Sequence, residues 1–191
     1  MATVVFVIGP HCSGKTSLLQ RLQKDLSMVR CSEIGKDLYY ERKFLTDLQG
    51  EEFEFEVTDL ELQRDNTFAG TPKIYGVETW HPGNIAYAAV RNPESVDRLI
   101  RLAQQSPFIE QAIGIWLRIP KETIMSRTIT FKDNKEWAAD FYSKLDTKFE
   151  SILDTLGLTN RTHVINGDRP FEEIVEEAKS IVKNATRYPI G

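Results

Sequence analysis

The stretch TVVFVIGPHCSGKTSLL, residues 3–19, decides the fold expected for this chain. Its first part, Thr3–Ile8, is a near-continuous apolar run, which is typical of a strand buried on both faces of a parallel sheet. Residues 9–16 then read Gly-x-x-x-x-Gly-Lys-Thr, the Walker A pattern of a phosphate-binding loop. Leucines at 18, 19 and 22 follow on one helical face. A strand, a glycine-rich loop and an amphipathic helix, in that order, form the context that supports the motif.

The chemistry of phosphate binding explains each position of this loop. Its glycines let the backbone curl so that N–H groups point at phosphate oxygens, and the following helix N-terminus adds about half a positive charge. Lys15 supplies a cation for the β- and γ-phosphates, and Thr16 supplies a hydroxyl for Mg²⁺. We therefore expect ATP to contact the loop and the first helical turn, which are Gly9, Pro10, His11, Cys12, Ser13, Gly14, Lys15, Thr16 and Ser17.

Size and composition exclude several other classes of protein. With 27% charged and 41% hydrophobic residues, the 191-residue chain is ordinary for a globular protein, and we expect residues 1–191 to form a single domain. The net charge of −4 disfavours binding to a nucleic-acid polymer. The sequence has no apolar run long enough to span a membrane and no basic N-terminal signal. Two cysteines cannot build a disulfide framework, so a cytoplasmic location is expected.

Apolar and amphipathic segments alternate along the rest of the chain, which is typical of α/β architecture. Further strands are expected at 28–32, 73–78, 113–119 and 162–165, and helices at 35–49, from Asn92, from Pro120, along 141–156 and at 171–182. Residues 51–67 fit a strand or a helix by period alone. A helix is favoured there because a crossover must precede the next strand, and its six acids are expected on a solvated face. The whole pattern predicts a three-layer α/β/α P-loop NTPase fold with a five-stranded, mostly parallel sheet.

Several segments now resemble the nucleoside and nucleotide kinase superfamily of P-loop proteins, and within it the thymidylate kinases and the ribosylnicotinamide-kinase-type domain. Ser32–Lys36 is similar to the acidic turn after the second strand of the latter. Ile74–His81 takes the place of the third-strand acidic motif, and Gly83–Ala88 is similar to the helix after that motif in thymidylate kinases. Val164–Pro170 is similar to the loop that passes near the adenine in these kinases.

The same resemblance implies a small lid, at about residues 127–136, after a strand and turn at Ile115–Glu122. Two features depart from the family pattern. The usual Asp-Arg pair after the third strand is Glu78-Thr79 here, and beyond Arg127 the lid carries only two lysines. A substrate-binding arginine is therefore missing at the end of the third strand.

The resemblance also implies roles for particular residues, with ATP and Mg²⁺ as cofactors. The catalytic candidates are Lys15, Glu33, Glu78 and Arg127, and the metal candidates are Thr16 and Glu78. Asp168, Arg169 and Pro170 are expected beside the adenine, and the acceptor is expected to contact Glu33, Tyr39, Arg64, Trp80 and His81. Glu78 either holds Mg²⁺ through water or orients the acceptor. Glu33 either takes the proton of an acceptor hydroxyl or binds a sugar.

These features predict an ATP- and Mg²⁺-dependent phosphotransferase that acts on a small nucleoside or nucleotide. The alternative is a P-loop NTPase that acts as a nucleotide-dependent switch or regulatory protein. The carboxylates and the missing arginine favour a hydroxyl acceptor, because a monophosphate needs cations around it. The resemblance to thymidylate kinases favours a monophosphate. The sequence leaves a homodimer open.

Overall fold

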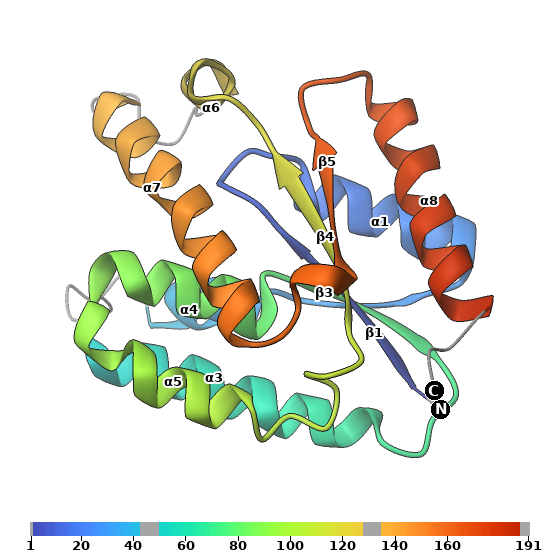
Figure 1. The fold of residues 1–191 in the computed structure, drawn as a ribbon, viewed down its shortest axis with the longest axis horizontal. Helices are drawn as coiled ribbons and strands as arrows, with labels where there is room; N and C mark the ends of the chain where they lie inside the picture. Colours follow the sequence, from blue (N-terminus) through green and yellow to red (C-terminus); the bar gives the residue numbers. More distant parts are fainter. Residues whose placement is uncertain (1, 43–49, 128–134, 188–191) are drawn as a thin grey trace.

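The computed structural model describes residues 2–42, 50–127 and 135–187. Its centre is a parallel sheet of five strands in the order β2-β3-β1-β4-β5 (Figure 1). The strands are β1 (Thr3–Ile8), β2 (Val29–Cys31), β3 (Ile74–Glu78), β4 (Ile113–Arg118) and β5 (Thr162–Asn166). All five expected strands are therefore confirmed. Because the strands are parallel, their carboxyl ends share one edge of the sheet, where ligands bind in open α/β folds.

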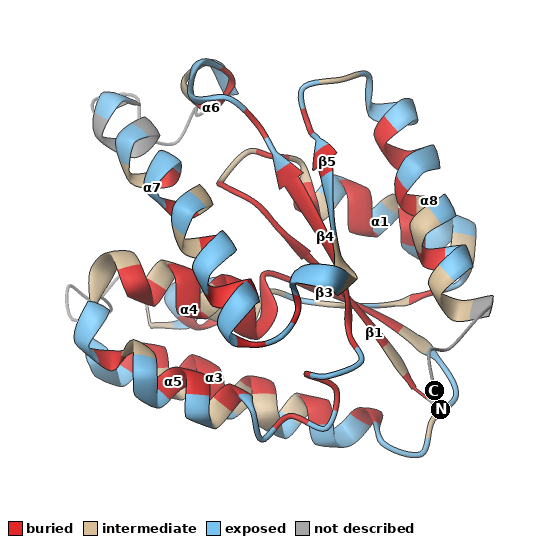
Figure 2. Ribbon diagram, in the orientation of Figure 1, coloured by how far each residue is buried: buried red, intermediate tan, exposed pale blue. Residues whose placement is uncertain are grey.

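Helices cover both faces of this sheet. They are α1 (Lys15–Leu26), α2 (Ile34–Glu41), α3 (Glu51–Phe68), α4 (Trp80–Arg91), α5 (Val96–Ala103), α6 (Lys121–Arg127), α7 (Lys135–Thr155) and α8 (Phe171–Arg187), with short 3₁₀ turns at Pro93–Ser95 and Thr159–Arg161. Helices α1 and α8 pack on one face against Val5 and Val7 of β1. The other face, with Val4, Phe6 and Ile8, is covered by α4, α5 and α7. This alternation along β1 gives the three expected layers, and Figure 2 shows the central strands buried between them.

Residues 51–68 form helix α3, which confirms the preference for a helix over a strand. The expectation that its six acids form a solvated face is wrong for two of them. Glu54 and Glu61 are buried, because α3 packs against α2, α4 and α5 rather than presenting one broad side to water. The buried Glu54 carboxylate accepts from Arg91 Nε at 2.9 Å and Nη2 at 3.0 Å.

Local sequence signals mark the end of α7 and the start of α5. Gly157 ends α7 with a positive φ of 69°, and the Leu158 N–H donates to the Leu153 carbonyl at 2.8 Å, as in a glycine-terminated helix. The helix expected from Asn92 begins instead as a 3₁₀ turn at Pro93, and α5 follows from Val96. The Asn92 side chain makes no capping hydrogen bond there, and its Nδ2 donates to Glu54 at 3.2 Å.

The described helices include none that is long and apolar enough to cross a membrane. The expected helix at 35–49 is seen as α2 over Ile34–Glu41, and its remaining part, residues 43–49, lies outside the described residues. Most of the expected lid, residues 128–134, also lies outside them. Arg127 at the end of α6 is described, and α7 resumes at Lys135.

Candidate active site

The phosphate-binding loop joins β1 to α1 and depends on its glycines. A Cβ atom at Gly9 would lie 2.5 Å from the Leu117 carbonyl oxygen, so only glycine fits beside β4. Gly14 has a φ of 96°, a left-handed conformation that glycine adopts without strain, and it stands at the N-cap of α1. The Leu18 N–H donates to the Gly14 carbonyl at 2.9 Å. The loop therefore leads directly into a helix N-terminus, which is suited to an anion.

Lys15 is folded back over this loop. Its Nζ donates to the Gly9 carbonyl at 3.1 Å and to the Pro10 carbonyl at 2.9 Å. Both partners are backbone atoms of the same loop. Phosphate oxygens entering the loop could therefore replace these bonds without separating any two elements of the fold.

Thr16 and Glu78 meet across the sheet edge. The Thr16 hydroxyl lies 2.8 Å and 2.9 Å from the two carboxylate oxygens of Glu78. The pairing of Val7 with Glu78 explains this contact, because it brings the end of β3 beside the start of the loop. A hydroxyl and a carboxylate are oxygen donors of the kind that Mg²⁺ prefers, so this pair fits the expected metal.

Glu33 joins the same edge from the start of α2. Its Oε1 accepts from the Thr79 hydroxyl at 2.8 Å. Burial raises the pKa of Glu78, and the nearby Glu33 charge raises it further, whereas Lys15 acts in the opposite direction. The two carboxylates therefore repel each other in the unliganded protein, and a bound cation would relieve that repulsion.

His11 and Cys12 form the rim of the loop, and both are half-buried. The His11 ring stacks on Tyr142 of α7, with ring centroids 5.7 Å apart and planes 19° apart. Burial lowers the pKa of His11, and the positive charge of Lys15 lowers it further. Deeper in the loop, the Ser13 hydroxyl is buried with no hydrogen-bond partner among the described residues, while Ser17 is exposed on the first turn of α1.

The loop after β5 also reaches the phosphate-binding loop. A Cβ atom at Gly167 would lie 3.6 Å from the Ser13 carbonyl oxygen. The next residues are Asp168, Arg169 and Pro170, so this segment begins beside the phosphate-binding loop. Arg127 contacts it through Nη1 to the Gly167 carbonyl at 3.3 Å and Nη2 to Asp168 at 3.2 Å. In this structure Arg127 is bound to the loop after β5 rather than to Thr16 or Glu78.

Three of the expected acceptor residues are held by partners elsewhere in the protein. Trp80 and His81 are fully buried, and both contact the carboxylate of Asp65 on α3. Arg64 donates to the Ser32 carbonyl at 3.2 Å and pairs with Glu61 at 3.2 Å. Tertiary partners therefore hold the Trp80 and His81 side chains inside the protein, and their contact with the acceptor stays a prediction. Tyr39 is exposed on α2.

The sequence did not single out Lys36 or Tyr142. Lys36 lies three residues after Glu33 on α2, and its charge acts on both His11 and Glu78. That i, i+3 spacing was a usable signal. Tyr142 had no such signal, because its contact with His11 depends on α7 folding back over the loop.

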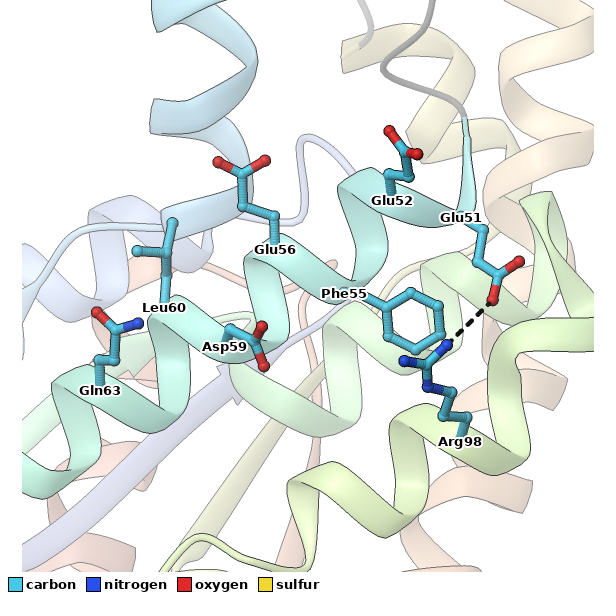
Figure 3. Close-up of a pocket in the computed structure, with 8 residues that line it drawn as sticks. All are labelled: Glu51, Glu52, Phe55, Glu56, Asp59, Leu60, Gln63 and Arg98. Carbon is cyan, nitrogen blue, oxygen red and sulfur yellow. Dashed lines mark ion pairs between the residues drawn. The ribbon is translucent and has the colours of Figure 1, made fainter.

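A groove of about 630 Å³ also lies along α3, away from the phosphate-binding loop (Figure 3). Four acids line it with Arg98, which pairs with Glu51 at 3.9 Å and lies 4.1 Å above the Phe55 ring. These acids would repel phosphate groups, so the groove does not suit a nucleotide.

Comparison with known proteins identifies the class of fold. No protein-family model and no curated protein matches the chain. Solved structures do match. NadR in complex with NR has a TM-score of 0.70 and 18% identity over 96% of this chain. Deoxyadenosine kinase from M. mycoides, with products bound, has a TM-score of 0.71 and 11% identity over 95% of this chain and 100% of its own.

Thymidylate kinase from Candida albicans is also similar, with a TM-score of 0.69 and 14% identity over 97% of this chain and 92% of its own. By contrast, the chain covers only 50% of NadR. The protein therefore has the fold of the P-loop nucleoside and nucleotide kinases, as its sequence indicated. At these identities, the likeness shows the fold and leaves the substrate to be argued from the site.

Proposed function

We propose that this protein is an ATP- and Mg²⁺-dependent kinase that transfers a phosphoryl group to a hydroxyl of a small nucleoside-type acceptor. One observation carries the proposal. A continuous line of contacts runs from Thr16 through Glu78, and from the adjacent Thr79 to Glu33. This line joins the phosphate-binding loop to two carboxylates at the carboxyl ends of neighbouring strands, where donor and acceptor would meet.

On this proposal, each residue of the site has a distinct role. The loop N–H groups and Lys15 bind the ATP phosphates, and the Asp168–Pro170 segment lies beside the adenine. Thr16 and Glu78 would hold Mg²⁺, which when bound neutralises charge on the phosphates. Glu33 accepts the proton of the acceptor hydroxyl, for which a carboxylate within hydrogen-bond reach is suited. Arg127 leaves Asp168 to stabilise the transferred group. Most of the catalysis is then alignment and electrostatic stabilisation.

The arrangement of cations favours a hydroxyl over a monophosphate. A monophosphate acceptor requires free cations around its oxygens. Three arginines of α2, α3 and α4 or their ends are already paired: Arg64 with Glu61 and Ser32, Arg91 with Glu54, and Arg42 with Glu56. Lys36 is exposed and contributes one positive charge, which is less than the charge of a monophosphate.

An acceptor screen tests the function directly. Purified protein with ATP and Mg²⁺ is given a panel of nucleosides and their monophosphates, and both ADP release and the phosphorylated product are measured. Turnover of a nucleoside supports the proposal, and turnover of a monophosphate alone would make the protein a nucleotide kinase. ATP consumption that no acceptor stimulates would support the alternative of a nucleotide-dependent switch.

Glu33→Gln tests the role of the carboxylate as base. The variant keeps the shape and removes the base, so kcat should fall by roughly 10²–10⁴ with ATP binding little changed. The matched control is Glu41→Gln, an exposed position on the same helix, which should leave kcat unchanged. An unchanged kcat in Glu33→Gln would overturn the proposed hydroxyl acceptor.

A cytoplasmic location and a homodimer remain predictions.

A further inference from the structure

The turn between β3 and α4 has an unfavourable backbone. Thr79 has φ 67° and ψ −60°, and Trp80 has φ 50°, so two consecutive side-chain-bearing residues have positive φ. A positive φ is a clear outlier for a β-branched residue such as threonine. Such a residue is disfavoured by its own backbone and persists only where its surroundings hold it. The same turn carries Glu78 and Thr79, which contact Thr16 and Glu33.

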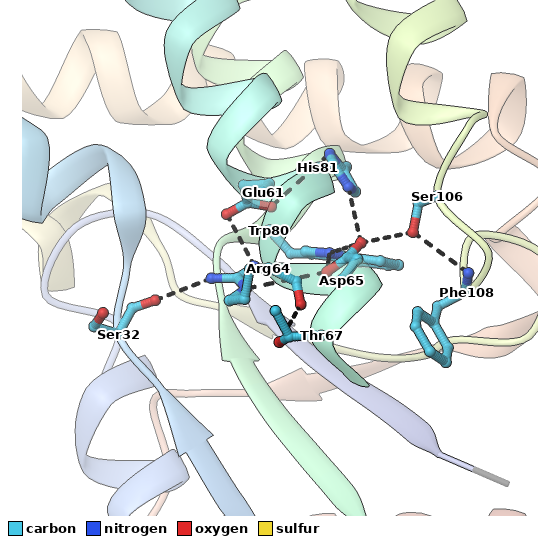
Figure 4. Close-up of polar contacts among 9 residues, drawn as sticks. All are labelled: Ser32, Glu61, Arg64, Asp65, Thr67, Trp80, His81, Ser106 and Phe108. Atoms are coloured by element: carbon cyan, nitrogen blue, oxygen red, sulfur yellow. Dashed lines mark hydrogen bonds and ion pairs between the residues drawn. The ribbon is translucent and has the colours of Figure 1, made fainter. Parts of the chain in front are cut away.

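Asp65 of α3 contacts the first turn of α4 directly (Figure 4). Its carboxylate, 0% exposed, accepts from Trp80 Nε1 at 3.1 Å and from the Ser106 hydroxyl at 2.6 Å. His81 Nε2 lies 3.1 Å from the same oxygen as Ser106. These partners come from α4 and from the loop after α5. Asp65 thus ties three segments together at the point where the strained turn begins.

Arg64, the neighbour of Asp65, holds the other carboxylate-bearing segment. Its Nη1 donates to the carbonyl of Ser32, the residue before Glu33, and its Nη2 pairs with Glu61. Arg64 and Asp65 therefore hold the two segments that carry the site carboxylates. These are the segment before Glu33 and the turn after Glu78. Within the described residues, neither Arg64 nor Asp65 forms a hydrogen bond or an ion pair with the phosphate-binding loop, so any influence on the site passes through the backbone segments that they hold.

We infer that Asp65 is a positioning residue, which holds the Thr79–Trp80 turn in its strained form and thereby sets Glu78 against Thr16 and Thr79 against Glu33. The inference rests on the proposed function. It explains why a carboxylate is buried beneath the site with three donors around it, and why the turn can keep a conformation that its own residues disfavour.

Asp65→Asn tests this role, with Asp59→Asn, exposed on the same helix, as the matched control. We expect kcat to fall roughly 10–100-fold, because small displacements of catalytic groups cost that much. The KM for ATP should change less than about twofold, since the phosphate-binding loop is untouched. The control should match the unmodified protein. An unchanged kcat, or a fall in ATP affinity as large as that in kcat, would overturn the inference.

A second variant asks whether Asp65 acts through the strained turn. Glycine adopts positive φ without strain, so a Thr79→Gly background removes the strain at the β-branched residue of the turn. Asp65→Asn should then cost less than about threefold in kcat beyond Thr79→Gly alone, a non-additivity expected of coupled residues. An equal cost in both backgrounds would show that Asp65 does not act through the turn.

Hydrogen exchange in the ligand-free protein gives a readout that needs no kinase activity. Asp65→Asn should speed exchange in peptides spanning 78–83 by about tenfold, with β1 little changed, as expected for local opening. Equal acceleration in β1 would reveal a general loss of stability and would overturn the inference. If Asp65→Asn does not fold, Ser106→Ala removes one donor and should produce the same local pattern more weakly; no local change would count against Asp65. Local acceleration in a protein without acceptor-dependent turnover would leave the held turn intact and refute only the proposed function.

Discussion

Two polar clusters lie near the same end of β3, and they differ in what their bonds connect. At the phosphate-binding edge, Lys15 donates to carbonyls of its own loop, and Thr16 contacts one carboxylate. In the cluster around Asp65, the bonds join α3 to α4 and to the loop after α5. Buried polar groups are found in both, so burial does not separate binding from support. The Lys15 bonds lie within one loop and can be exchanged for bonds to a ligand, whereas the Asp65 bonds join separate segments and hold them together.

Lys15→Ala should have the largest effect on phosphoryl transfer. It tests most directly whether the phosphate-binding edge serves binding rather than stability. Removing one preorganised donor costs about 10²–10³ in rate, so phosphoryl transfer should fall by at least that much. The rise in Tm that ATP and Mg²⁺ cause should shrink in the same variant, whereas the Tm without ligand should change little. Activity assays and thermal-shift titration measure these quantities.

Lys24→Ala, exposed on the same helix α1, is the matched control and should leave both measurements unchanged. A large fall in the Tm of Lys15→Ala without ligand would show that the phosphate-binding edge also stabilises the fold. The contrast between the two clusters would then be lost.

Gly83→Ala probes the place where the two clusters meet. A Cβ atom at Gly83 would lie 2.6 Å from the Thr79 Cγ2 and 3.2 Å from the Ile8 Cγ2. Overpacking of this kind costs about 1–3 kcal/mol, which urea unfolding should register as a lower free energy of unfolding. Gly35→Ala, where the nearest atom lies at 3.7 Å, is the control and should be close to neutral. Equal costs at both glycines would contradict the tight approach of α4 to the turn.

Glu61→Gln tests the electrostatics of the enclosed cluster. Burial raises the pKa of Glu61 above its ordinary value of 4.5, although Arg64 and His81 oppose the shift. As the pH rises from 4.5, the unfolded chain loses this proton before the folded protein does, so the carboxylate progressively lowers the stability of the folded state. Glutamine removes that loss. The free energy of unfolding of the variant should therefore rise relative to that of the unmodified protein as the pH rises.

Urea unfolding at intervals from pH 4.5 to pH 7.5 measures this difference. Glu52→Gln, an exposed acid on the same helix, serves as the control and should follow the unmodified protein throughout. Parallel curves for Glu61→Gln and the unmodified protein would show that the folded environment of Glu61 does not disfavour its charge.

Arg127→Ala should have the smallest effect on stability. The side chains of Arg127 and Asp168 are 39% and 42% exposed, and exposed ion pairs contribute about 0–1 kcal/mol. The free energy of unfolding should therefore change by less than about 1 kcal/mol, as should that of Arg101→Ala, an exposed arginine on α5. A loss comparable to that of Gly83→Ala would place Arg127 among the residues that hold the fold rather than among those free to move.

Local sequence predicted much of the fold. All five strands follow from apolar runs, and the helix at 51–68 follows from the need for a crossover before β3. The Schellman-type ending of α7 at Gly157 is also a local signal, since its bonds join residues at most five positions apart. The candidate site was predictable where residues stand at strand ends, as Glu33 and Glu78 do. It was not predictable where a polar side chain could point either toward the phosphate-binding loop or into the protein interior.

The sequence by itself determined the unit of β1, phosphate-binding loop and α1, because its glycines, lysine and threonine act on groups a few positions away. Only the tertiary structure decided which polar side chains face that loop. Trp80 and His81 turn inward because Asp65, some 15 positions earlier, offers a buried acceptor. Glu54 is buried because Arg91, 37 positions later, can neutralise it. Short-range patterns fix backbone conformation, whereas the direction of a polar side chain depends on partners that only the packed helices bring within reach.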